Sequence, residues 1–196
     1  MKRLVIPSLL LAALASWAAN PHLAVVARKN VAAGGAPWTQ TFSETGGSTR
    51  SIGQTGAGGV AFEFVPTNTI SISQVTFYAL SFGTAGTNRF EVEIWTDNGS
   101  SNPGVALPGT TVVVNQSDLA ATNTAHTVTL GAAASLTNAA TYYVVFWPHQ
   151  LSAFNYAKVD YNATGGSGWD IHGSTDGTNY TGNIDFDAYM RGGISE

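Results

Sequence analysis

The chain has 196 residues, of which 44% are hydrophobic, 10% are charged and none is cysteine. The charged fraction is less than half of the usual quarter, which excludes a charge-rich disordered chain and a heptad coiled coil. The absence of cysteine excludes a disulfide framework and a thiolate metal site. Eight lysines and arginines against twelve acidic residues give a net charge of −4, which argues against nucleic-acid binding.

The first 36 residues differ in charge from the rest of the chain. They carry four basic residues and no acidic one, whereas residues 37–196 carry four basic and twelve acidic residues, a net charge of −8. Residues 1–29 are predicted to form an apolar, cationic N-terminal arm or signal segment. The Gly- and Ala-rich residues 30–36 are predicted to be a linker, and residues 37–196 a single domain.

Two interpretations of the N-terminal segment stay open. A basic start precedes an apolar stretch that Asn20 and Pro21 end, which is the pattern of a secretory signal. The stretch contains Pro7 and falls short of the roughly 20 residues that a membrane span needs, so no spanning segment is predicted. Either residues 1–19 are cleaved on export as a signal, or residues 1–29 are retained as an arm buried against neighbouring subunits.

The remainder of the chain has the composition of short strands joined by turns. Runs rich in Val, Ile, Thr and aromatic residues alternate with Gly, Asn, Asp, Ser and Pro, and no window shows helical apolar spacing. This pattern predicts an all-β fold, an antiparallel two-sheet β-sandwich that is jelly-roll-like, preceded by the apolar N-terminal arm. The predicted strands are residues 38–43, 60–65, 70–82, 89–96, 110–114, 125–130, 141–147, 154–160, 168–172 and 184–190.

Alternation within single strands predicts which side chains form the core. Phe90, Val92 and Ile94 share one face and are expected inside, while Glu91 and Glu93 are expected to face solvent or a partner. Residues 141–147 are apolar on both faces, as in a central strand. Residues 184–190 alternate in the same way as 89–96 and are predicted to be one strand.

Five short segments occur in a recognisable order along the chain: QTF at 40–42, ISQVTF at 72–77, VEIWTDNG at 92–99, PG at 103–104 and LTNAATYYVV at 136–145. This order resembles the choice-of-anchor β-sandwich domains of bacterial surface proteins. That resemblance implies a non-enzymatic module, although residues 191–196 lack the apolar stretch of the family's C-terminal anchor. In its pattern of short strands and turns the chain is also similar to jelly-roll proteins of phage tails, fibres and head decorations, in which an N-terminal arm provides attachment.

No residue is predicted to be catalytic. None of the four histidines lies in a recognisable catalytic motif, and residues 165–169 lack the closing glycine of a nucleophile elbow. The glycine-rich residues 53–59 lack the Lys-Ser/Thr ending of a phosphate loop. The sequence therefore predicts neither an enzyme nor a required cofactor.

Calcium is the one ion that the sequence leaves open. Asp176, Asp185 and Asp187 are metal candidates, since they lie in a stretch rich in Asp and Asn, which supply the hard oxygen ligands that calcium prefers. The EF-hand spacing is absent, and Asp176 precedes a glycine in a strong hairpin-turn signal. Turn formation and a solvated strand face explain these residues better, so no metal site is predicted.

Four aromatic residues are candidates for a contact surface. Trp95, Trp147, Trp169 and Tyr180 lie at strand ends or at predicted outward positions, where they could stack on sugar rings or pack against another subunit. The alternative is that these side chains complete the sandwich core.

The preferred functional hypothesis is a non-enzymatic structural protein. It displays its β-sandwich on a multi-subunit assembly, in particular a phage-like virion, to which the N-terminal arm attaches it as a decoration, tail or fibre-associated protein. Its partners are then other protein subunits, in a homo-oligomer or a larger assembly. The alternative is an exported bacterial surface or extracellular module that binds glycan or matrix, and a third hypothesis is a secreted carbohydrate-active enzyme. All three place the protein on a virion, outside the cell or at the cell surface.

Overall fold

The computed structural model divides the chain into a unit of residues Met1–Ala36 and a unit of residues Pro37–Glu196. The predicted arm and linker lie outside the residues that the structure describes. All described residues belong to the second unit. They are residues 40–43, 45–55, 58–84, 88–150, 152–163, 171–175, 180, 183–185 and 189–196.

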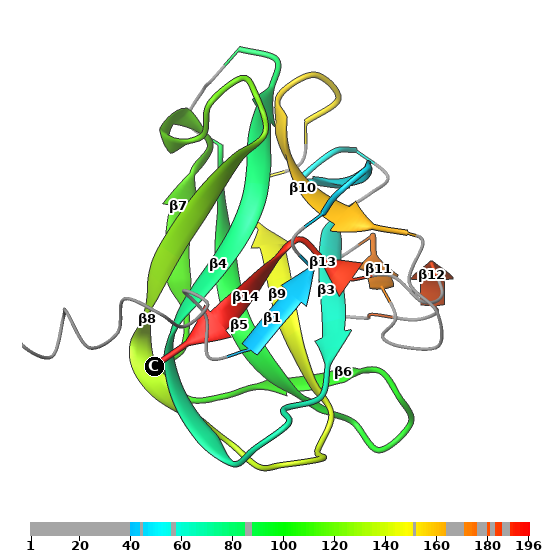
Figure 1. The fold of residues 1–196 in the computed structure, drawn as a ribbon. Helices are drawn as coiled ribbons and strands as arrows, with labels where there is room; N and C mark the ends of the chain where they lie inside the picture. Colours follow the sequence, from blue (N-terminus) through cyan, green and yellow to red (C-terminus); the bar gives the residue numbers. More distant parts are fainter. Residues whose placement is uncertain are drawn as a thin grey trace, which may run out of the picture. The chain divides into compact units, whose positions relative to one another are not determined.

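The described residues form two antiparallel sheets, which confirms the predicted all-β two-sheet sandwich. In Figure 1 strands of the first sheet cross in front of strands of the second. The first sheet contains β1(Gln40–Ser43), β2(Ser48–Ile52), β4(Ile70–Phe82), β8(Thr124–Leu136), β10(Tyr156–Asn162), β13(Tyr189–Met190) and β14(Gly192–Ser195). The second contains β3(Gly59–Phe64), β5(Arg89–Asp97), β6(Pro103–Ala106), β7(Val112–Asn115), β9(Tyr142–Pro148), β11(Ile171–Ser174) and β12(Asn183–Asp185).

The core lies between the sheets and follows the period of two in each strand. Phe90, Val92 and Ile94 of β5 are fully buried there, as the alternation predicts. Phe146 of β9 packs edge-on against Phe77 of β4, with ring centroids 5.0 Å apart. Such edge-to-face pairs add to the stabilisation that burial of the rings provides.

The prediction of one strand over residues 184–190 is wrong. Its ends are two short strands in different sheets, because β12 pairs with β11 in the second sheet and β13 pairs with β10 in the first. Alternation reports only which side chains share a face, so two short strands that belong to different sheets give the same pattern as one continuous strand. Residues 186–188 lie outside the described part of the chain.

A glycine allows the last strand to join the first sheet. Gly192 opens β14 opposite Phe77 of β4, with a φ of 140° that side chains rarely adopt. A Cβ atom at this position would collide with the carbonyl oxygen of Thr76. The Gly-rich sequence of β14 hid this strand from pattern analysis, although the close approach requires a glycine there.

Replacement of Gly192 by alanine should destabilise the protein by at least about 2 kcal/mol, because strained backbone and a backbone collision then coincide. The free energy of unfolding in urea measures this loss. Gly47→Ala is the matched control, because a Cβ there meets no atom within 4 Å, and its effect should stay within about 0.5 kcal/mol. Equal effects of the two substitutions would contradict the role given to Gly192.

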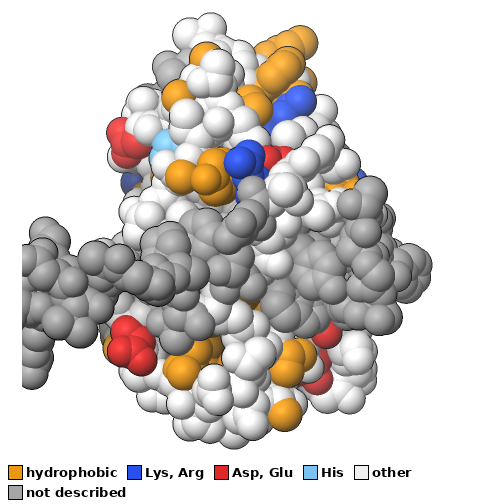
Figure 2. All heavy atoms as spheres, in the orientation of Figure 1, with side chains coloured by type: hydrophobic (Ala, Val, Ile, Leu, Met, Phe, Trp, Pro, Cys, Tyr) orange, Lys and Arg blue, Asp and Glu red, His pale blue; other side chains and the backbone are white. Residues whose placement is uncertain are grey.

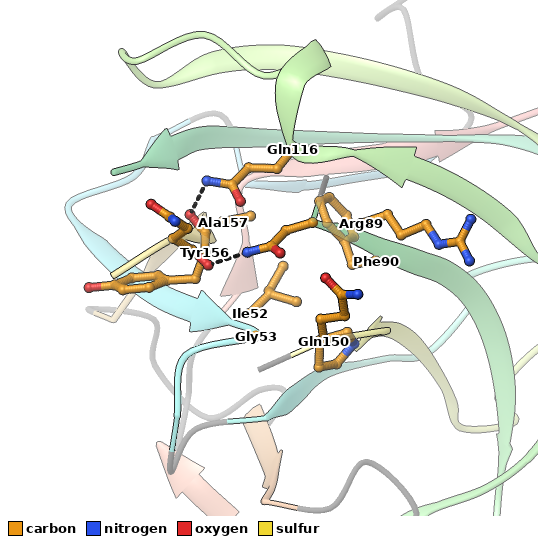
Figure 3. Close-up of a pocket in the computed structure, with 11 residues that line it drawn as sticks. Ile52, Gly53, Arg89, Phe90, Gln116, Gln150, Tyr156 and Ala157 are labelled. Carbon is orange, nitrogen blue, oxygen red and sulfur yellow. Dashed lines mark hydrogen bonds between the residues drawn. The ribbon is translucent and has the colours of Figure 1, made fainter. Parts of the chain in front are cut away.

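A buried glutamine ties the two sheets together at one end of the sandwich. Gln116 begins the short helical turn η1(Gln116–Asp118), directly after β7 of the second sheet. Its Nε2 donates to the carbonyl oxygens of Phe82 at 3.0 Å and of Tyr156 at 3.1 Å, both in the first sheet. Figure 3 shows the Gln116 side chain reaching toward Tyr156. A buried amide that is bonded in this way specifies how the sheets are aligned at this end.

Candidate functional site

The outer face of the second sheet carries the candidate site. Strand β9 lies between β3 and β5 and is apolar on both faces, as the sequence predicts. Its outward side chains, Tyr143 and Val145, are fully buried and form a second cluster with Tyr180, against which Trp95 packs. An outward strand face of this kind needs a cover, and aromatic side chains supply part of it.

Tyr180 belongs to this cover rather than to an exposed contact surface. It is 4% exposed, and its ring packs edge-on against Trp95 with centroids 5.7 Å apart. Gly59 of β3 makes room for it, since a Cβ on Gly59 would lie 2.5 Å from the Tyr180 hydroxyl oxygen. Tyr180 therefore supports Trp95 and offers little surface to a ligand.

The exposed part of the cover is a pair of tryptophans. In the register of β5 and β9, Trp95 lies opposite Tyr143 and Trp147 lies opposite Glu91. The two indoles lean toward each other across Val145, with ring centroids 6.5 Å apart and planes inclined by 27°. Both tryptophans are partly exposed, so they form a continuous aromatic surface above a buried strand.

This aromatic surface is one wall of an open groove of about 450 Å³. Such a volume is typical of small-molecule sites, whereas the hollow beside Gln116 in Figure 3 measures about 10 Å³ and has room for about one water molecule. Strand β6 forms the opposite wall. The groove is lined by Glu91, Glu93, Trp95, Val105, Ala106 and Trp147, together with Gly104.

The groove lies where the neighbouring edge of the sheet is interrupted. Strand β5 pairs with β7 along its first half and with β6 near its end, so Glu93 lies between the two edge strands. The buried hydroxyl of Thr110 accepts the Ile94 amide at 3.3 Å and donates to the Leu107 carbonyl oxygen at 3.0 Å. The Ile94 amide and the Leu107 carbonyl group therefore have hydrogen-bond partners at the point where β5 is not paired with β6 or β7.

Glu93 holds the tryptophan in place. Its Oε2 accepts from the Trp95 indole Nε1 at 2.7 Å, and its Oε1 accepts from the Thr111 hydroxyl at 2.6 Å. Glu93 is 9% exposed, so the expectation that it faces solvent is wrong. The Glu93 side chain does point to the outer face of the sheet, but neighbouring residues cover it. Strand alternation predicts the face to which a side chain points and not whether other residues cover that face.

Glu91 is the more exposed of the two carboxylates that line the groove. Its side chain is 24% exposed, and its Oε1 lies 2.9 Å from Nε2 of His149. This fits the expected outward, partly solvated position. Both carboxylates thus lie beside the tryptophans, an association that needs the register between β5 and β9 and that the sequence alone does not contain.

The other predicted site residues are not part of this groove. Trp169, Asp176 and Asp187 lie outside the described residues, and Asp185 is described only as backbone in β12. Within the described ranges, no group of three or more His, Asp or Glu side chains could hold a metal ion. Asp97, near the groove, stabilises the turn that follows it, since its Oδ2 accepts a hydrogen bond from the Gly99 amide at 2.7 Å.

Comparison with protein-family models and with curated proteins gave no match to this chain. The described residues also contain no helix that is long and apolar enough to cross a membrane.

Replacement of Glu93 by alanine should destabilise the protein by about 1–3 kcal/mol, because the Trp95 indole and the Thr111 hydroxyl lose their buried acceptor. Glu91→Ala is the control and should cost no more than about 1 kcal/mol, since its contact with His149 is partly exposed. Urea denaturation followed by tryptophan fluorescence measures both. A Glu93→Ala effect no larger than that of Glu91→Ala would contradict the positioning role of Glu93.

Proposed function

We propose that the sandwich is a non-enzymatic carbohydrate-binding module, with the groove as its glycan site. The observation that carries this proposal is the Trp95–Trp147 pair, stacked and partly exposed along an open groove beside two carboxylates. The apolar face of a sugar ring packs on an indole, while its hydroxyls need hydrogen-bonding groups at the ring edge. Polysaccharides are presented outside cells and on their surfaces, which is the setting that this activity fits.

The state of the carboxylates supports binding rather than hydrolysis. Both oxygens of Glu93 already accept hydrogen bonds, so this carboxylate is engaged in holding Trp95.

Binding to an array of neutral, amino and acidic polysaccharides tests the proposal. Trp147→Ala should weaken binding of the preferred glycan about tenfold or more, because an aromatic stack contributes about 1 kcal/mol beyond its buried area and about 1.4 kcal/mol corresponds to tenfold. Phe154→Ala is the control, since Phe154 is an exposed aromatic residue outside the groove. Equal binding by both variants and the parent chain would refute the proposal.

A second function, display on a multi-subunit assembly, is favoured by an apolar patch at another place. Phe154 is 77% exposed and Phe82 is 43% exposed. Phe82 stacks on Tyr156 with centroids 4.8 Å apart, and the Lys158 ammonium lies 4.7 Å from its ring. Figure 2 shows hydrophobic side chains beside a basic one at the upper right, over the segment that leads into β10. Exposed apolar patches of this kind mark protein contacts.

Sedimentation of the full chain over a range of concentrations tests this second function. Assembly through the patch predicts a multimer that Phe154→Ser dissociates, with the melting temperature unchanged because Phe154 lies outside the core. A parent chain that stays monomeric, or a multimer that the substitution does not affect, would exclude assembly through this patch.

A further inference from the structure

The ionic character of the groove restricts the glycan that it can accept. Two carboxylates, Glu91 and Glu93, lie among the described residues that line the groove, and none of those described residues is a lysine or an arginine. Among the described residues, His149 contacts Glu91, and Arg89 lies two residues before Glu91 in β5, outside the groove lining. The described part of the lining therefore presents carboxylates and no cation to a ligand that lies along the tryptophans.

The two carboxylates differ in what they can offer. Glu93 has both oxygens occupied by Trp95 and Thr111 and is nearly inaccessible. Glu91 uses Oε1 for His149, and its Oε2 accepts no hydrogen bond from the described residues. The Glu91 side chain is 24% exposed, so Glu91 is the carboxylate that a ligand would contact.

The chemistry of that oxygen discriminates between classes of sugar. A carboxylate accepts hydrogen bonds and donates none, so it cannot hydrogen-bond to the carboxylate of a uronate or to a sulfate group, and like charges in a partly desolvated groove repel. An ammonium group gives it a charge-assisted hydrogen bond, which is shorter and stronger than one from a neutral hydroxyl. An ammonium near an indole face is attracted to the ring as well.

We propose that the groove is a site for glycans that carry free amino groups, with Glu91 as the specificity-determining residue and the Trp95–Trp147 surface as the platform for the sugar rings. This inference rests on the proposed glycan-binding function and adds the ligand class. His149 acts as a positioning residue, since its contact at 2.9 Å fixes one oxygen of Glu91 and leaves the other directed to the ligand.

Calorimetric titration of the full chain with three short oligosaccharides tests the ligand class. The probes are a glucosamine tetramer, its N-acetylated form and a galacturonate tetramer. The glucosamine tetramer should bind about tenfold more tightly than the acetylated one, and the galacturonate tetramer should not bind. Raising the salt concentration to 0.5 M should reduce the preference, because Glu91 is partly exposed and its charge is screened.

Glu91→Gln should remove the preference, so that the ratio of the two affinities falls from about ten to about one. Asp118→Asn makes the same change of charge on an exposed residue outside the groove and should leave the ratio unchanged. Equal affinity for both tetramers in the parent chain, or a ratio that Glu91→Gln does not alter, would overturn the amino-sugar inference while leaving glycan binding intact. If Trp147→Ala instead bound both tetramers as tightly as the parent chain, the glycan site itself would be refuted.

Discussion

The burial of strand β9 on both faces is the constraint on which the second sheet depends. Its inward residues complete the core, and its outward residues Tyr143 and Val145 are equally buried. Leaving an apolar side chain of this size in water costs about 1.5–3 kcal/mol, so the outer face requires a cover. Gly59 admits Tyr180 onto the sheet, and Tyr180 in turn supports Trp95.

The groove lies where the aromatic side chains that cover the outer face of the second sheet end. Trp95 and Trp147 stack on each other at the outer face of the second sheet and remain partly exposed. The buried carboxylate of Glu93 fixes the orientation of one indole, and it is tolerated because both of its oxygens are bonded. An aromatic surface whose side chains are already held in place by hydrogen bonds and packing suits a ligand with a flat apolar face, because little side-chain freedom is lost on binding.

The sequence indicates which face of its own strand each side chain occupies, but it says little about the residues that lie beside it on neighbouring strands. Alternation correctly predicted that Phe90 is inside and that Glu93 points outward, because both follow from the period of a single strand. It could not show that Glu93 is covered, since Thr111 reaches it from 18 residues away. Trp95 and Trp147 were separately recognisable as candidates, yet their contact depends on the pairing of β5 with β9.

The strand errors have the same origin. Residues 184–190 alternate like one strand, but the two ends pair in different sheets, which is a property of their partners. β14 was missed because Gly192 and its neighbour lack the side chains on which strand patterns rest, although the close approach to Thr76 demands a glycine. Long-range packing, which local pattern does not encode, decided both cases.

A crystal structure of the full chain with a bound glucosamine oligosaccharide would show whether the groove binds amino sugars. We expect a sugar ring lying parallel to the Trp147 indole, with its amino nitrogen within hydrogen-bond distance of Glu91 and with Trp95 still bonded to Glu93. A sugar bound at another place, or a groove filled by a neighbouring protein chain while the oligosaccharide stays in solution, would contradict it.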